Sequence, residues 1–187
     1  MKGKPKKDKK NESSDLRWFF IVVVLSFVIS IIFSFISAKV ISGLPVVPAI
    51  LFLIFVIFVG ILFDVIGVSV TVAKESDFHA MASKKISGSK TSIKLIKNSA
   101  KVSNVCADVI GDVAGVLSGA ISALITMKIT EKFNLEFDLQ FIISAIVASL
   151  TIGGKALGKG IAQKKSTKII AAVGKIVKIF GNENTKK

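Results

Sequence analysis

Long uncharged apolar runs constrain this chain more than any other feature of its sequence. Residues 18–38 contain no charged side chain, and residues 40–73 contain only one, Asp64. A helix of about 20 residues crosses the roughly 30 Å hydrocarbon core of a bilayer. Because that core holds no water, each backbone N–H and C=O must be paired within the chain, and a helix achieves this alone. The runs therefore predict transmembrane helices, with a cleaved signal peptide as the alternative for the first run.

Two later runs contain more polar residues but are long enough to span a bilayer as well. We expect a membrane domain over residues 17–163, with an all-α polytopic fold. Pro45 and Pro48 mark the start of its second helix, because proline suits the first turn of a helix. The four expected spans cover about residues 18–38, 48–72, 105–127 and 139–158.

The basic residues give this arrangement an orientation. Of the 26 lysines and arginines, 23 lie in residues 1–17, 74–101 and 155–187. Four spans place these three segments on one side of the membrane, and the positive-inside rule makes that side cytoplasmic. We therefore expect a multi-pass protein of the cell membrane with both termini in the cytoplasm. The net charge of +14 then reflects topology and attraction to anionic lipid headgroups, and we expect no nucleic-acid partner.

The segments outside the spans have distinct patterns. Residues 1–16 are polar and basic, which predicts a disordered tail. Residues 182–187 form a short polar end. Residues 74–104 predict a cytoplasmic helical hairpin that turns at Ser87-Gly88-Ser89. Residues 164–181 carry lysines on one helical face and apolar residues on the other, which predicts an amphipathic helix on the membrane surface. The alternative is a helix that packs on a missing soluble domain.

Small residues recur along the last two spans. In lipid, a stripe of small residues lets helix backbones approach closely, so we expect the third span to pack through its stripe. The Gly153-Gly154 pair of the fourth span is a candidate break in that helix, where backbone groups would face a cavity. The stripe of the third span consists of Ala107, Gly111, Gly115, Gly119 and Ala123.

Three aspartates within the apolar runs are the candidate functional residues. Asp108 and Asp112 are one helical turn apart, and Asp64 lies well inside the second run. Acids at membrane depth are costly, so they usually face the protein interior and often bind ions or protons. Magnesium prefers such oxygen ligands and keeps several waters. The alternative for Asp108 is a structural role at the interface, where it would cap the third helix and pair with lysines. A purely structural role is also the alternative for Asp64 and Asp112.

The sequence offers little for enzymatic chemistry. With one cysteine and one histidine, the chain can form neither an internal disulfide nor a cysteine-based metal site. It has no nucleophile–base arrangement and no phosphate-binding glycine loop. We expect no enzyme and no cofactor, apart from Mg²⁺ as a bound or transported ion.

Four short motifs follow one another at the ends of the last three spans and in the hairpin. They are Ser69-Val70-Thr71-Val72-Ala73, Lys97-Asn98-Ser99, Ile110-Gly111-Asp112 and Thr151-Ile152-Gly153-Gly154-Lys155-Ala156-Leu157-Gly158-Lys159. In this order and spacing they resemble the transmembrane domain of the CNNM/CorC (cyclin-M-like) family of magnesium and cobalt transporters, over about residues 50 to 180. In that family, a span ends in a pattern like S-E-T-A-L, a basic hairpin follows, the next span opens with G-N-N, and the last ends in G-E-x-x-P-K-x-x-A.

The resemblance implies a homodimer that transports or binds a divalent cation, magnesium first and cobalt second. The resemblance implies that the ion site here consists of Ser69 and Asp112, and further of Thr151 and Gly153. Asp64 and Asp108 are additional candidate ligands because they are acids within the apolar runs. The chain departs from the family at Val70, Thr151 and Gly154, and it lacks the nucleotide-sensing CBS domains of many relatives. These departures keep two alternatives open: a non-transporting scaffold or regulatory subunit, and a small pore-forming or holin-like protein.

Overall fold

The computed structural model describes residues 8–134 and 139–180, and within them it contains helices and no strands. The expected all-α fold is therefore confirmed. Within these described ranges, four helical segments are long and apolar enough to cross a membrane, as expected for a multi-pass membrane protein. These segments are Leu16–Gly43, Val46–Val72, Ser99–Phe133 and Gln140–Phe180.

The first two spans are single uninterrupted helices. Helix α1 covers Asp8–Gly43, and α2 covers Val46–Val72, with Pro45 at its N-cap. Helix α1 thus begins within the segment expected to be a disordered tail, whose first seven residues lie outside the described ranges. Extending an existing helix needs no new nucleus, so polar residues such as lysine and glutamate can continue it.

The polar segment after α2 forms the expected helical hairpin. Helix α3 covers Glu75–Ser83, and α4 covers Ser89–Lys97. Between them Gly88 has φ = 88°, a left-handed conformation that glycine adopts without steric cost. The turn therefore lies where the Ser-Gly-Ser sequence predicts it.

The third span changes its helical geometry along its length. It begins as α5, Ser99–Ser103, continues as the π-helix η1, Asn104–Ile110, and ends as the regular helix α6, Gly111–Phe133. In the π-helical stretch the Gly111 N–H donates to Cys106 O, five residues earlier. Such wider turns are rare, and they are frequent at functional sites.

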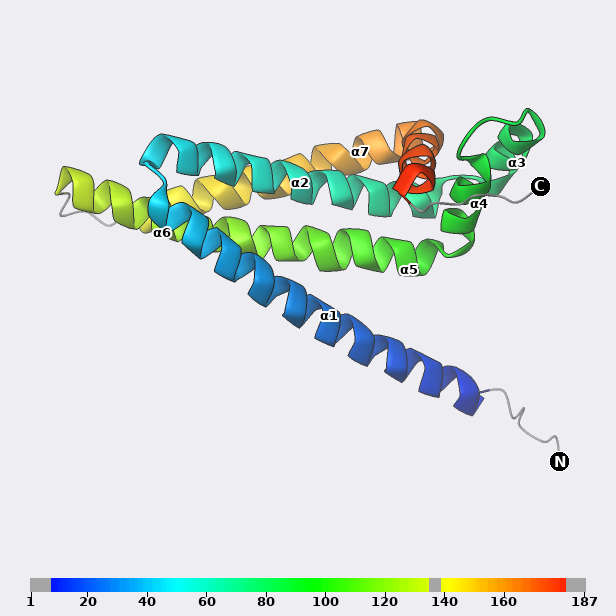
Figure 1. Cartoon of the computed structure of the whole chain (residues 1–187), viewed down its shortest axis with the longest axis horizontal. Helices are drawn as coiled ribbons and strands as arrows, with labels where there is room; N and C mark the ends of the chain where they lie inside the picture. The colour runs from blue at the N-terminus through cyan, green and yellow to red at the C-terminus, as the bar shows by residue number, and fades with distance from the viewer. Residues whose placement is uncertain (1–7, 135–138, 181–187) are drawn as a thin grey trace.

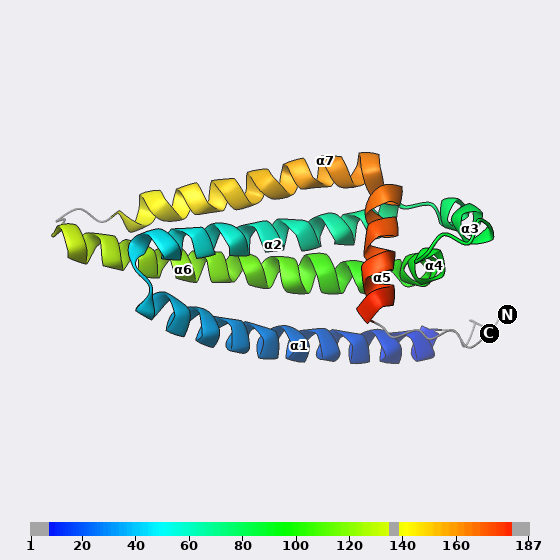
Figure 2. The same cartoon turned by 45° about the horizontal axis from the view of Figure 1, so that its top comes forward.

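Helix α7 covers Gln140–Phe180 and contains both the fourth span and the expected amphipathic helix. Its direction changes at Lys165, where φ is −125° and ψ is 21°. Beyond this kink the helix turns across the end of the bundle, as Figure 2 shows in orange and red. The Gly153-Gly154 pair, in contrast, lies inside a regular helix, so the expected break at this pair is wrong.

The glycines of α7 serve close packing instead. A Cβ at Gly158 would come within 2.6 Å of Val65 Cγ2, and one at Gly154 would clash with Ile61. Helices α2 and α7 therefore approach more closely than larger side chains would allow. Together with the antiparallel α6 they form a three-helix bundle, beside which α1 runs at an angle (Figure 1).

Candidate functional site

One face of α2 packs against the third span, and Asp64 lies on this face. A Cβ at Gly60 would come within 2.8 Å of Ala114 Cβ, and one at Gly67 would meet Ala107 Cβ at the same distance. Asp64 follows Gly60 by four residues and precedes Gly67 by three, so all three residues share this face. Asp64 is consequently level with the part of η1 between Ala107 and Gly111.

The Asp64 carboxyl group is buried without complete hydrogen bonding. The residue is 5% exposed, and its Oδ2 has no hydrogen-bond partner within the described parts of the chain. A buried polar atom without a partner carries a desolvation penalty of about 1–3 kcal/mol, and more when it is charged. An oxygen in this position can accept a cation or a proton.

Ser69 is the second side chain with an unpartnered buried oxygen. It is 0% exposed, and its Oγ finds no partner among the described residues. Ile61 and Val65 face Gly154 and Gly158 of α7, and Ser69 continues this four-residue period. Ser69 therefore faces α7, while Asp64 faces η1. The two residues are five positions apart, or about 7.5 Å along the helix axis.

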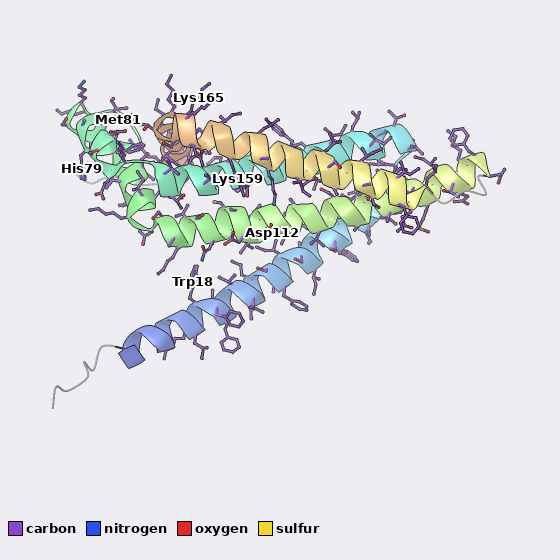
Figure 3. The ribbon with its side chains drawn as sticks, turned by 180° about the vertical axis from the view of Figure 1, so that it is seen from behind. Trp18, His79, Met81, Asp112, Lys159 and Lys165 are labelled. Atoms are coloured by element: carbon purple, nitrogen blue, oxygen red, sulfur yellow. The ribbon has the colours of Figure 1, made fainter. Side chains whose placement is uncertain are left out.

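Asp112 forms an ion pair between two spans. Lys155 Nζ of α7 donates to Asp112 Oδ1 of α6 at 3.1 Å, where the Lys155 side chain is 21% exposed and that of Asp112 is 72% exposed. Asp112 lies in the first turn of α6, and Figure 3 places it along the third span, away from the hairpin that carries His79 and Met81. Asp112 follows Gly111, which packs near Gly60, so it is about 13 Å from the level of Ser69 along the bundle.

The remaining candidates lie around this region on other surfaces. Asp108 of η1 is exposed. Thr151 of α7 is half-buried, and its hydroxyl donates to Val147 O at 2.8 Å, so it keeps a free lone pair for a second contact. Gly153 is exposed, and no atom would lie within 4 Å of a Cβ built there.

The three aspartates do not gather into one acidic cluster. Among residues 8–134 and 139–180, no group of three or more His, Cys, Asp or Glu side chains is placed to hold a metal ion. An ion bound at Asp64 would need its other oxygens from hydroxyl groups, backbone carbonyls and water. Magnesium accepts such a set, because it keeps several waters and takes one or two carboxylates.

Two parts of this region could not be inferred from the sequence pattern. The π-helical turn leaves no distinctive residue pattern, and the ion pair joins residues 43 positions apart on separate helices. The available signal for the pair was weak: Lys155 is a lone cation at the end of an apolar run, and such a residue usually has a partner inside the protein.

The hairpin carries a separate charged group outside the spans. His79 Nε2 lies 2.9 Å from Glu75 Oε1, and Lys97 Nζ lies 3.5 Å from the same oxygen. The hydrogen bond with His79, followed by the attraction of Lys97, lowers the pKa of Glu75 below its ordinary value. Glu75 is therefore ionised at neutral pH and links α3 to α4 on the surface.

Comparison with known proteins provides no relative from which to transfer a function. No protein-family model, no curated protein and no solved structure matches this chain.

Proposed function

We propose that this protein binds and transports a divalent cation, magnesium first and cobalt second. The observation that carries the proposal is the buried carboxyl of Asp64 beside a π-helical turn of the third span, whose Oδ2 has no hydrogen-bond partner among the residues that the structure describes. A buried acid at membrane depth usually belongs to an ion or proton pathway. Magnesium needs hard oxygen ligands, and Asp64 would provide the negative charge.

Transport would follow from alternating exposure of this region between α2, the third span and α7. Ser69 adds a buried hydroxyl on the same helix, and Thr151 adds a lone pair on α7. Asp112 would contribute after release from Lys155, which holds it at 3.1 Å. The cation itself would compete with the lysine ammonium for this carboxylate, because both are positive.

The wider assignment rests on sequence. The order of the four motifs supports a CNNM/CorC-like membrane domain, acting as a homodimer. The concentration of lysine and arginine in three segments supports a location in the cell membrane with both termini and the hairpin in the cytoplasm.

Thermal unfolding of the purified full-length protein tests the proposal. A ligand at 100 times its Kd stabilises the folded state by about 2.7 kcal/mol, so saturating Mg²⁺ should raise Tm by about 5–10 °C. Asp64→Asn keeps the shape of the side chain, removes its charge, and should abolish most of this shift. Asp108→Asn removes an exposed acid from η1 and is the matched control, which should respond like the wild type.

The two rival functions predict different results. A scaffold or regulatory subunit would show neither stabilisation by any divalent ion nor magnesium flux in proteoliposomes. A holin-like pore would show flux without cation selectivity. If Mg²⁺ raised Tm equally in the wild type and in Asp64→Asn, Asp64 would not be a ligand of the bound ion. The Asp112→Ala variant would then test the remaining acid.

A further inference from the structure

An apolar cavity of about 420 Å³ lies between α1 and the three-helix bundle. Helix α1 forms one wall with residues such as Ile29 and Ile36, and α2 and the third span form the others with residues such as Val59 and Leu117. Among the residues that the structure describes, the lining contains one polar side chain, Ser37, and no charged one. Such a cavity does not hold ordered water, because a buried water molecule needs two to four polar partners.

The cavity lies at the depth of the hydrocarbon core. The first candidate span begins at Leu16 and ends at Gly43. Ile29 is about 20 Å from its beginning and Ser37 about 9 Å from its end, at 1.5 Å per residue. No residue in the most apolar stretch of α1 is buried in protein, so acyl chains surround this helix in a bilayer. Hydrocarbon chains are therefore the molecules that have access to the cavity from outside.

Contacts at both ends of α1 keep this helix from closing onto the bundle. Lys128 and the buried Ile41 hold one end. Near the other end, Lys101 Nζ of α5 lies 5.5 Å from the centre of the Trp18 ring, in a cation–π contact. Between these contacts α1 is one uninterrupted helix, and such a helix curves only gently. The space between the two fixed ends needs an occupant, because packed proteins leave few voids larger than a water molecule.

The size of the cavity decides between the occupants that a membrane offers. One helical turn with its side chains is about 10–12 Å wide and 5.4 Å long, which amounts to about 400–600 Å³. A helix from a second copy of this chain would fill the cavity with a single turn, and the rest of that helix would displace α1. An acyl chain is narrow and flexible, and it can enter where Phe33 and Ile36 are exposed to the lipid beside α1.

We propose that one acyl chain of a bilayer phospholipid occupies this cavity and completes the packing between α1 and the bundle. The chain contacts the aliphatic and phenylalanine side chains of the lining, and its headgroup stays at the membrane surface. Ile110, the last residue of η1, and Phe63, which precedes Asp64, are among the residues that it contacts. The lipid thus packs next to the candidate ion site, but its binding requires no cation.

Photocrosslinking in vesicles tests this site on the full-length protein. The protein is reconstituted in phosphatidylcholine that carries a diazirine near the middle of one acyl chain, and after irradiation the labelled residues are located by mass spectrometry. We expect adducts at Val59, which is half-buried in the cavity wall, and at its neighbour Phe58, which is exposed and does not line the cavity. Ile36→Trp places a large ring in the cavity, so it should lose the Val59 adduct and keep the Phe58 adduct.

Matched variants separate a chain in the cavity from the lipid that surrounds the protein. Ile31 is 53% exposed and Ile36 is 48% exposed, but Ile31 does not line the cavity, so Ile31→Trp should keep both adducts. If Ile36→Trp does not fold, Ile29→Trp fills the cavity from two turns earlier and should give the same loss. A wild type labelled at Phe58 but not at Val59 would mean that α1 or a second copy closes the cavity, and it would overturn the proposal. Equal Val59 labelling in Ile36→Trp and Ile31→Trp would also overturn it, because the label would then come from bulk lipid.

Discussion

The first and third spans are both apolar helices, yet they pack in opposite ways. In the most apolar 18-residue stretch of α1 no residue is buried, whereas 56% of the residues are buried in the corresponding stretch of the third span, Ser99–Phe133. Helix α1 exposes large side chains such as Phe27, while the third span meets α2 through Ala107, Gly111 and Ala114. In lipid, apolar area alone does not drive association, because lipid tails are equally apolar. Small residues and polar contacts decide which span joins the bundle.

A polar contact and one buried apolar side chain, Ile41, together hold α1 at one end. Lys128 Nζ of α6 donates to Ile41 O at 2.5 Å, to Leu44 O at 2.7 Å and to Ser42 O at 3.1 Å. A cation at the last carbonyls of a helix is stabilising, because these groups have no partner within the helix. Between α1 and the bundle lies an apolar cavity of about 420 Å³, lined mainly by aliphatic and phenylalanine side chains.

The largest effect is expected where the glycine packing is closest. In Gly158→Leu the new side chain would overlap Val65, whose branched Cβ leaves it little freedom to move. Overpacking costs about 1–3 kcal/mol, so Tm should fall by up to about 10 °C. Gly160→Leu is the matched control, because no atom would lie within 4 Å of a Cβ there. Similar Tm values for both variants would mean that small residues do not determine packing in this bundle.

A smaller effect is expected at the α1 contact. Lys128→Met keeps the length of the side chain but leaves three carbonyl groups without their donor. We expect a loss of about 1–2 kcal/mol, a Tm lower by about 5 °C, and faster hydrogen exchange of the backbone between α1 and α2. Lys132→Met, at an exposed lysine one turn further along α6, should leave exchange unchanged. If exchange stayed slow without Lys128, the apolar packing of Ile41 would be sufficient to hold this end of α1.

The smallest effect is expected at Gly115, although the sequence stripe gives it the same importance as Gly111. No atom would lie within 4 Å of a Cβ at Gly115, which lines a groove of about 160 Å³ with Thr151 and Ile152. Gly115→Leu should therefore shift Tm of the protomer by less than about 2 °C, as for most open positions. Light scattering in detergent then tests the groove: loss of a dimer with unchanged Tm would place the partner subunit there. A large fall in Tm of Gly115→Leu would instead mean that the small-residue stripe at Gly115 packs against another helix of the same protomer.

The sequence alone determined the main architecture, because the physics of the bilayer allows few choices. Apolar runs long enough to cross a bilayer form helices in lipid, so the four spans follow from length and hydropathy, although the third contains two aspartates and the fourth a lysine. The hairpin follows from the polar residues around Ser87-Gly88-Ser89, since glycine tolerates the positive φ found at Gly88. The amphipathic pattern of residues 164–181 predicted a helix, and its described residues lie within α7, but the pattern did not predict the kink at Lys165.

Only the tertiary structure decided which small residues pack and which acids lie buried. Gly111 and Gly115 are one turn apart in the same stripe, but of these two only Gly111 would bring an added Cβ within 4 Å of atoms of α2 and α7. Asp64 and Asp112 are both acids inside apolar runs. Asp64 is buried, with an oxygen that has no partner in the described parts of the chain, whereas Asp112 is exposed and paired with Lys155. Periodicity places residues on a common helix face, but the rotation and neighbours of that helix depend on contacts with residues far away in the sequence.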